Sequence, residues 1–200
     1  MISDDYKFIF LNIPKNAGQS IKSALFHITA NKSYGAPNHA DLTFFHKNFP
    51  EQTGFYLKFC VVRNPFDRIV SFYHYKKKLC KNYNPLNFHD NYHFLKNPKE
   101  VKIFSEQSFE YLLLNGYLNI GPQYPKMCIG KKFSINFLIR FENLQNDFNE
   151  FLSTRSMPSF KLPHKNKSQR QSYQTYYSNN SIEYVNKQYN IDLKAFGYNF

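Results

Sequence analysis

The amino-acid sequence predicts an α/β domain in which helices flank a mainly parallel central sheet. Short apolar segments alternate with segments of helical periodicity. Two of the apolar segments stop at polar, turn-forming corners, as strands do before the helices of βαβ units. With 200 residues, 42% of them hydrophobic and 19% aromatic, the chain can also bury a substantial core, so we expect residues 1–200 to form a single domain.

The first predicted strand and helix lie near the N-terminus. Residues 7–12 form a mostly apolar segment that is typical of a buried strand. From Gly18 onward the period changes to i, i+3, i+4, i+7, which predicts a helix with an apolar face at Ile21, Ala24, Leu25 and Ile28. Residues 31–54 carry several Gly and Pro residues and are expected to form a loop with a short helix around residues 40–47.

A second strand and helix are predicted in the middle of the chain. Residues 56–62 are apolar and end in valines, which is typical of a buried strand. Pro65 then stands where a first-turn proline helps a helix to begin, and the helical face continues at Phe66, Ile69, Val70 and Tyr73. Residues 81–106 are rich in Asn, Lys and Pro, so we expect an irregular insertion there, followed by a helix near residues 107–115.

The last part of the sequence predicts one more strand and two helices. Residues 134–141 form the third strand, and apolar residues between positions 144 and 152 indicate a helix. Residues 153–180 are polar and basic with little apolar pattern. Residues 182–200 are expected to form a short helix and then an aromatic anchor at Phe196, Tyr198 and Phe200.

Charge and cysteine content limit the kinds of partner and compartment. The net charge is +12, from 26 Lys and Arg against 14 Asp and Glu, which favours anionic partners without choosing among them. Three cysteines without a CxxC motif argue against a disulfide framework and against a zinc site. No segment approaches the ~20 apolar residues of a membrane span. The N-terminus carries no signal-peptide pattern, so a cytoplasmic protein is expected.

The first corner follows the first strand and has the sequence IPKNAGQS, residues 13–20. In parallel α/β sheets, ligands bind where strand ends feed helix N-termini, and backbone N–H groups there attract anions. Lys15 adds a positive charge, Ser20 adds a hydroxyl, and Gly18 allows a close backbone approach. The nucleoside-triphosphate loop GxxxxGKS/T is absent, because the lysine precedes the glycine. An ordinary strand–helix turn with an exposed lysine is the alternative.

The second corner follows the second strand and has the sequence VRNPFDRIVS, residues 62–71. Arg63 ends the strand, where a guanidinium suits bidentate recognition of phosphate. Ser71 lies two helical turns beyond Asn64 and can face the same side as Asp67. The alternative is that Arg63 and Arg68 only pair with Asp67 or Glu142. Together, the two corners predict a site for a ligand with two separate anionic ends.

These residues resemble the sulfotransferases. IPKNAGQS is similar to their 5′-phosphosulfate loop, commonly IPKTGGTS, and differs from it at Asn16, Ala17 and Gln19. Residues 62–71 closely resemble their 3′-phosphate motif, RNPxDRxVS. The likeness is strongest to the carbohydrate branch with its soluble bacterial-type members, and it extends over IRFENL (139–144), LPHKN (162–166) and DLKAFGY (192–198). Residues 81–130 match least and are a candidate acceptor-side insertion.

The resemblance implies a P-loop-like three-layer domain that uses the donor 3′-phosphoadenosine 5′-phosphosulfate (PAPS), without a metal or a covalent enzyme intermediate. Lys15 would stabilise the leaving phosphate, and Arg63 and Ser71 would hold the 3′-phosphate. The 5′-phosphosulfate would lie on the Ser20 hydroxyl and on the backbone amides of Asn16, Ala17, Gly18, Gln19 and Ser20. Lys165, in a loop similar to the cofactor-closing segment, is a further candidate contact to the donor.

An acceptor hydroxyl also needs a base, and His39 is the first candidate. It lies between the two motifs, where relatives often carry a histidine, and its ordinary pKa suits proton transfer near neutral pH. A surface loop histidine is the alternative, and His46 is the second candidate for the base. His89 and His93 stand at i, i+4 spacing beside Asp90, but without a convincing third ligand they do not predict a metal site.

The expected function is therefore transfer of a sulfuryl group to a hydroxyl, with an amine as second choice, of a carbohydrate or other small acceptor. The sequence predicts neither a nucleic-acid partner nor a membrane span. Three alternatives stay open. One is a kinase-like phosphotransferase, which the missing nucleoside-triphosphate loop opposes. A second is a non-catalytic binder of acidic polymers, and a third is a member of the family that binds the donor without transferring anything.

Overall fold

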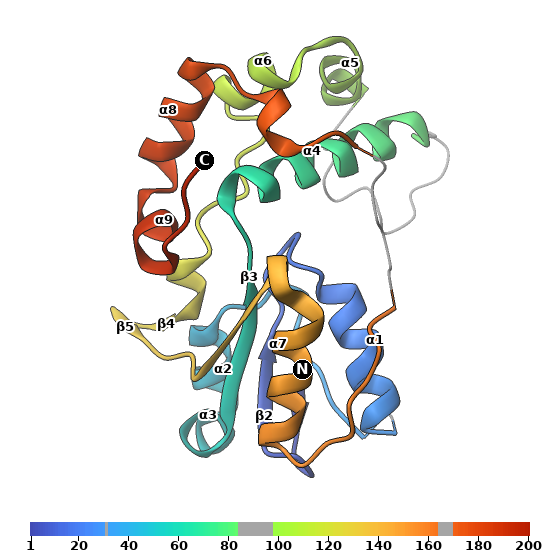
Figure 1. Cartoon of the computed structure of the whole chain (residues 1–200), viewed down its shortest axis with the longest axis vertical. Helices are drawn as coiled ribbons and strands as arrows, with labels where there is room; N and C mark the ends of the chain where they lie inside the picture. The colour runs from blue at the N-terminus through green and yellow to red at the C-terminus, as the bar shows by residue number, and fades with distance from the viewer. Residues whose placement is uncertain (31, 84–97, 164–169) are drawn as a thin grey trace.

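The computed structural model describes residues 1–30, 32–83, 98–163 and 170–200. Two lobes make up the molecule: a lower one around the sheet and an upper one of helices (Figure 1). The sheet has the strand order β1-β2-β3-β6, in which β2 (Phe8–Leu11), β3 (Leu57–Val62) and β6 (Phe137–Arg140) run parallel. A short edge strand, β1 (Ile2–Ser3), pairs antiparallel with β2. The predicted mainly parallel α/β sheet is confirmed.

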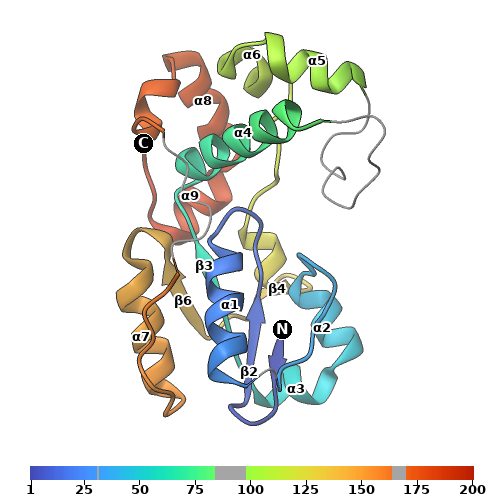
Figure 2. The same ribbon diagram turned by 90° about the vertical axis from the view of Figure 1, so that its right-hand side faces the viewer.

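Helices cover both faces of this sheet. Successive side chains of a strand point to opposite faces, so the same strands contribute to a core on each side. Phe8 and Phe59 face the helices α1 (Gly18–Ile28) and α7 (Leu144–Thr154), which contribute Ile21, Leu25, Phe148, Phe151 and Leu152 to a shared core. Ile9 and Cys60 face the other way, into a second core shared with α2 (Leu42–Asn48) and α9 (Asn190–Phe196). Figure 2 shows α1 in front of the strands, with α7 at the left and α2 at the right.

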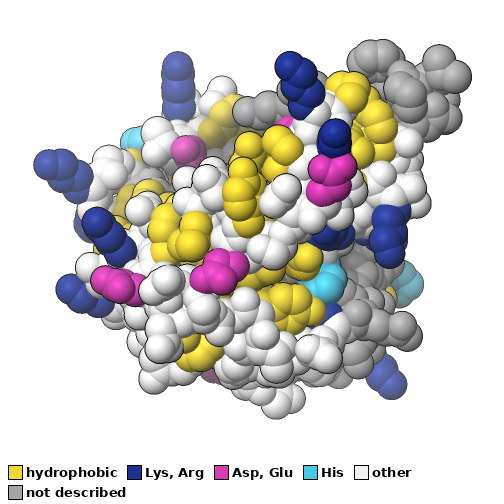
Figure 3. All heavy atoms as spheres, turned by 90° about the horizontal axis from the view of Figure 1, so that it is seen from above, with side chains coloured by type: hydrophobic (Ala, Val, Ile, Leu, Met, Phe, Trp, Pro, Cys, Tyr) yellow, Lys and Arg dark blue, Asp and Glu magenta, His cyan; other side chains and the backbone are white. Residues whose placement is uncertain are grey.

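The upper lobe is built on α4 (Pro65–Lys81), which leaves the end of β3 and crosses above the sheet (Figure 1). Helices α5 (Pro98–Glu106), α6 (Phe109–Leu114) and α8 (Asn179–Gln188) pack around it. Their core contains Phe66, Phe104, Leu112 and Val185. Seen from above, the Lys and Arg side chains drawn in colour are spread singly around this face, with apolar side chains between them (Figure 3).

The remaining described elements are short. Helix α3 (Pro50–Phe55) follows α2, and β4 (Cys128–Ile129) pairs with β5 (Lys132–Phe133) as a small hairpin. Single 3₁₀ turns occur at Tyr124–Met127, Phe141–Asn143 and Tyr173–Tyr176.

Several local predictions need correction. Part of the expected irregular insertion is the helix α5, which tertiary contacts support: Phe104 is buried and Glu100 pairs with Lys76 at 2.8 Å. Helix α3 lies within the expected loop, because a first-turn proline starts it there. The third strand is shorter than expected, and the C-terminal segment forms two helices, α8 and α9, instead of one. Residues 84–97 of the predicted insertion lie outside the described residues.

Candidate functional site

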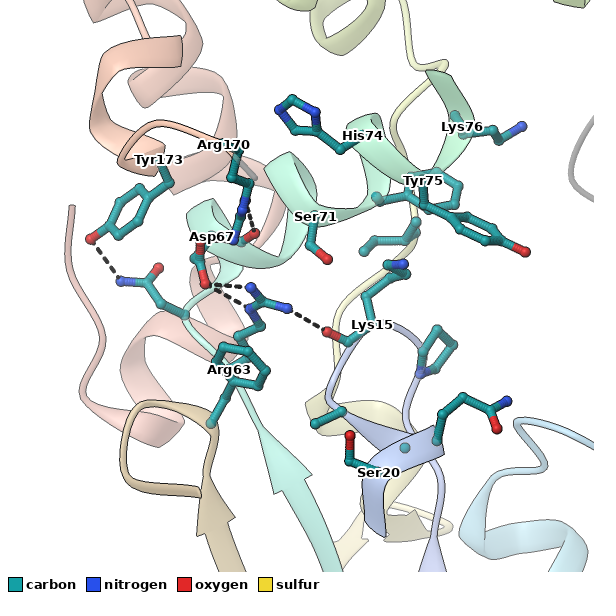
Figure 4. Close-up of a pocket in the computed structure, with 18 of the residues that line it drawn as sticks. Lys15, Ser20, Arg63, Asp67, Ser71, His74, Tyr75, Lys76, Arg170 and Tyr173 are labelled. Carbon is teal, nitrogen blue, oxygen red and sulfur yellow. Dashed lines mark hydrogen bonds and ion pairs between the residues drawn. The ribbon is translucent and has the colours of Figure 1, made fainter. Parts of the chain in front are cut away.

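A cleft of about 2210 Å³ opens at the carboxyl ends of β2 and β3, below α4. Sites for one small ligand usually measure about 300–1,000 Å³, so this cleft has room for two ligands. Eight of the predicted site residues line it: Lys15, Ala17, Gly18, Gln19, Ser20, His39, Arg63 and Ser71. Figure 4 shows Ser20 below Lys15, Arg63 to the left of Lys15, and Ser71 above it on α4. Lys165 lies outside the described residues.

The first corner presents open backbone amides to the cleft. Within the described part of the chain, the N–H groups of Ala17, Gly18 and Gln19 have no acceptor, and these residues line the cleft at the start of the 11-residue helix α1. The nearly buried Ser20 hydroxyl also has no partner among the described residues. Free amides at a helix N-terminus bind anions. This corner can therefore hold a phosphate or sulfate group.

Gly18 is also needed for packing inside the protein. A Cβ atom at this position would lie 1.8 Å from Oδ1 of Asn12, so no other residue fits without moving that side chain. The close approach is to Asn12, at the end of β2. The predicted contact of the Asn16 amide to the donor stays a prediction, and Asn16 has partners within the protein. Its N–H points to the Ile13 carbonyl at 3.4 Å, and its side chain is buried away from the cleft.

Ala17, the residue directly before α1, lies in the left-handed backbone region, with φ 56°. That conformation costs a residue with a Cβ about 1–2 kcal/mol, whereas glycine adopts it freely. We therefore expect Ala17→Gly to raise the free energy of unfolding by up to about 1 kcal/mol, measured by urea denaturation. The matched control is Ala24→Gly in the interior of α1, which is expected to lower it by at least about 1 kcal/mol. A lower free energy of unfolding in Ala17→Gly would show that the backbone of Ala17 is not strained.

The second corner brings Arg63 into direct contact with the first. Its Nη1 donates to the Lys15 carbonyl oxygen at 2.8 Å, and its Nε donates to Asp67 Oδ2 at 2.7 Å. Nη2 also reaches Asp67 Oδ2, at 2.6 Å, and the guanidinium stacks on Phe141 with 3.7 Å to the ring centre. The ion pair with Asp67 that the sequence left open is present. A guanidinium has five N–H groups, so two remain available for a ligand.

Asp67 holds a second arginine as well. Arg170 forms an ion pair with Asp67 Oδ1 (Figure 4), so two guanidinium groups share one carboxylate. Ser71, one helical turn beyond Asp67, has a hydroxyl without a partner among the described residues. With Lys15 across the cleft, this group carries a net positive charge. The alternative pairing of Arg68 with Asp67 or Glu142 is absent, because Arg68 is fully buried and donates to carbonyl oxygens of Pro14 and Gly121.

Lys15 is a poorly hydrated cation in the cleft. No carboxylate among the described residues pairs with it, and its Nζ lies 4.2 Å from the ring centre of Tyr75. Burial, and then the charges of Arg63 and Arg170, lower the pKa of Lys15 to about 8. The ammonium is therefore mostly charged at neutral pH, and a nearby anion would interact with it strongly because little water screens the pair.

His39 has the geometry of a base. Its Nδ1 lies 3.0 Å from the Asn12 carbonyl oxygen, which can only accept, so Nδ1 carries the proton. In the neutral ring, Nε2 then holds the free electron pair. Burial lowers the pKa of His39 more than the nearby charge of Lys22 does, so the ring is neutral at pH 7. His46 is exposed on α2 and does not line the cleft.

Comparison with known proteins identifies the family. A sequence model described as "Sulfotransferase family" matches residues 1–199. The chain belongs to the sulfotransferase family. An uncharacterized protein of Archaeoglobus fulgidus is 30% identical over 103 residues, which cover 52% of this chain and 70% of that protein. No solved structure matches the chain, so the P-loop-like character of the fold stays a prediction.

Family membership shows a transferase that moves sulfuryl groups and therefore needs an acceptor substrate. The described residues of this sulfotransferase contain no helix long and apolar enough to cross a membrane, and no group of three or more potential metal ligands. The spaced histidines His89 and His93 lie outside the described residues.

Several cleft residues of the sulfotransferase were missed from the sequence. His74 and Tyr75 lie on the face of α4 that also carries Asp67 and Ser71, so continuing the i, i+4, i+7 spacing would have found them. His74 Nε2 lies 2.7 Å from the hydroxyl of Tyr176. Tyr173 comes from a distant segment, and no local pattern predicts that it reaches this cleft.

Proposed function

We propose that this sulfotransferase uses PAPS as its donor and transfers the sulfuryl group to a hydroxyl, or secondarily an amine, of a carbohydrate or other small acceptor. The observation that carries the proposal is the hydrogen bond from Arg63 to the Lys15 carbonyl, which joins two anion-binding corners in one cleft. A nucleotide with phosphate groups at both its 3′ and 5′ ends matches two such corners. The volume of the cleft leaves space beside it for an acceptor.

The residues at the first corner would bind the 5′-phosphosulfate. The free amides of Ala17, Gly18 and Gln19 and the hydroxyl of Ser20 supply hydrogen-bond donors, and Lys15 supplies the charge. At the second corner, Ser71 and the two remaining N–H groups of Arg63 would bind the 3′-phosphate. Lys165 remains a proposed contact to the donor. The 3′-phosphate contact would separate this donor from ATP.

The chemistry follows from where charge and protons move. In an in-line transfer, the bond from sulfur to the departing phosphate oxygen breaks as the bond to the acceptor oxygen forms. Negative charge grows on the departing phosphate, where Lys15 stabilises it. The acceptor hydroxyl gives its proton to Nε2 of His39, because Nδ1 is already committed to Asn12. Positioning and fixed charge then supply most of the catalysis.

These two roles predict a bell-shaped dependence of kcat/KM on pH. His39 must be neutral and its pKa is lowered from 6.5, so activity should fall only below about pH 6.5. Lys15 must be charged and its pKa is about 8, so activity should fall again above about pH 8. The measurement is kcat/KM for the donor from pH 5 to pH 9.5. Lys15→Arg is the matched variant, and its alkaline limb should disappear. An alkaline limb that Lys15→Arg retains would exclude Lys15 as its source.

The donor is tested by calorimetric binding of adenosine 3′,5′-bisphosphate, ADP and ATP, without magnesium and at one moderate salt concentration. The expected result is micromolar binding of the bisphosphate, with ADP and ATP at least about 10-fold weaker, or about 1.4 kcal/mol. Equal binding of all three nucleotides, or none, would overturn the use of PAPS.

A further inference from the structure

A buried glutamine links the two corners from behind the cleft. Gln123 is fully buried and comes just before the 3₁₀ turn Tyr124–Met127. Its side-chain oxygen accepts from Asn16 Nδ2 at 2.6 Å and from the Arg63 backbone N–H at 3.1 Å. Its side-chain nitrogen donates to the Arg63 carbonyl at 2.8 Å and to Asp192 Oδ2 at 3.1 Å. All four hydrogen-bonding positions of the amide are therefore used.

The bonds of Gln123 reach both corners at once. Asn16 belongs to the loop after β2, and Arg63 directly follows β3, so one side chain holds a residue of each corner. Asn16 is itself almost fully buried, and its Nδ2 also donates to the Val61 carbonyl at 2.6 Å. A buried amide with two donors and two acceptors is the one neutral side-chain type that satisfies such a set of partners.

Gln123 is in turn held by Asp192 on α9. This carboxylate is fully buried and accepts from the backbone N–H groups of Gln123, at 2.7 Å, and of Tyr124, at 2.8 Å. The bridge therefore runs from the C-terminal helix through Gln123 to both corners. All four hydrogen-bonding positions of the buried Gln123 amide are occupied, so any movement of this side chain would leave buried polar groups without a partner.

We propose that Gln123 is a positioning residue that sets the separation of the two corners and thereby the preference for a nucleotide with two anionic ends. The inference rests on the proposed function. A ligand that contacts one corner alone gains little affinity when the distance between the two corners is fixed. A ligand that spans both corners gains affinity because the site is already arranged for it.

The test compares adenosine 3′,5′-bisphosphate with AMP, which lacks the 3′-phosphate, by calorimetry on the full chain. In Gln123→Met, which keeps the side-chain length but removes its hydrogen bonds, the preference for the bisphosphate should fall at least about tenfold. Affinity for AMP should change less than about threefold. Leu118→Ala, a buried apolar truncation in the same segment, should lower the unfolding temperature and leave the preference unchanged.

The possible results separate the proposed PAPS site from the proposed role of Gln123. A wild-type chain that binds both nucleotides equally overturns the donor site, and the role of Gln123 with it. A wild-type preference that survives in Gln123→Met overturns the role of Gln123 alone. Should Gln123→Met fail to fold, Asn16→Ser breaks the same bridge from the loop side, because serine is too short to reach Gln123. An unchanged preference in Asn16→Ser then overturns the role.

Discussion

Lys15→Ala is expected to lower kcat by about 10²–10³-fold, equivalent to about 2.7–4 kcal/mol, while affinity for adenosine 3′,5′-bisphosphate falls less than about tenfold. The loss in kcat exceeds the loss in affinity because of where the Lys15 ammonium lies. Lys15 lies in the cleft with the Tyr75 ring beside it and without a carboxylate among the described residues, so its charge is available to a departing phosphate. That charge is needed most when negative charge develops, and an interaction that grows in the transition state raises kcat.

The measurement pairs single-turnover rates with calorimetric affinities. Lys15 has φ 68°, and alanine meets about the same backbone strain there, so the substitution adds little of its own. Lys47→Ala, at an exposed position on α2 outside the cleft, is the control for lost net charge and should change neither quantity. Losses of the same size in rate and in affinity would show that Lys15 only binds the donor and does not assist its departure.

The strands and the main helices could be predicted because their signals are local. Three parallel strands show as apolar segments, and α1 and α4 show as apolar faces that begin at Gly18 and Pro65. Parallel strands bring their carboxyl ends to one edge of the sheet, so Lys15 and Arg63 were expected to share a site, and both line the cleft.

The parts that were not predicted depend on contacts between distant residues. Helix α5 has only a weak local pattern and is stabilised by the ion pair of Glu100 with Lys76. Gln123 and Asp192 look like ordinary polar residues in the sequence, yet both are fully buried in one hydrogen-bond network. A period of 2 or 3.6 residues reports which face of an element is buried, and it carries no information about such partners.

The same limit applies to Arg63. Its place at a strand end predicted a phosphate ligand, and the structure gives it an ion pair with Asp67 and a bond to the Lys15 carbonyl as well. Its binding role and its structural role share one guanidinium, because five N–H groups can serve both. Residue type and spacing identified the position, but only the fold shows how its hydrogen bonds are divided.

His39→Asn is expected to lower the rate of transfer by about 10²–10⁴-fold while leaving donor affinity within about twofold. Asparagine suits this position for two reasons. It tolerates the left-handed backbone, which His39 adopts with φ 65°, and its side-chain N–H can still donate to the Asn12 carbonyl. The variant therefore keeps the loop and removes only the basic nitrogen, so a lost rate can be assigned to proton transfer.

Two further variants make this assignment specific. His46→Asn replaces an exposed histidine on α2 outside the cleft and should transfer at the normal rate. In His39→Ala, added imidazole should restore part of the transfer, since a free base can enter the space that the ring leaves. Near-normal transfer by His39→Asn would exclude His39 as the base. His74 would then be tested next, because it also lines the cleft and burial lowers its pKa as well.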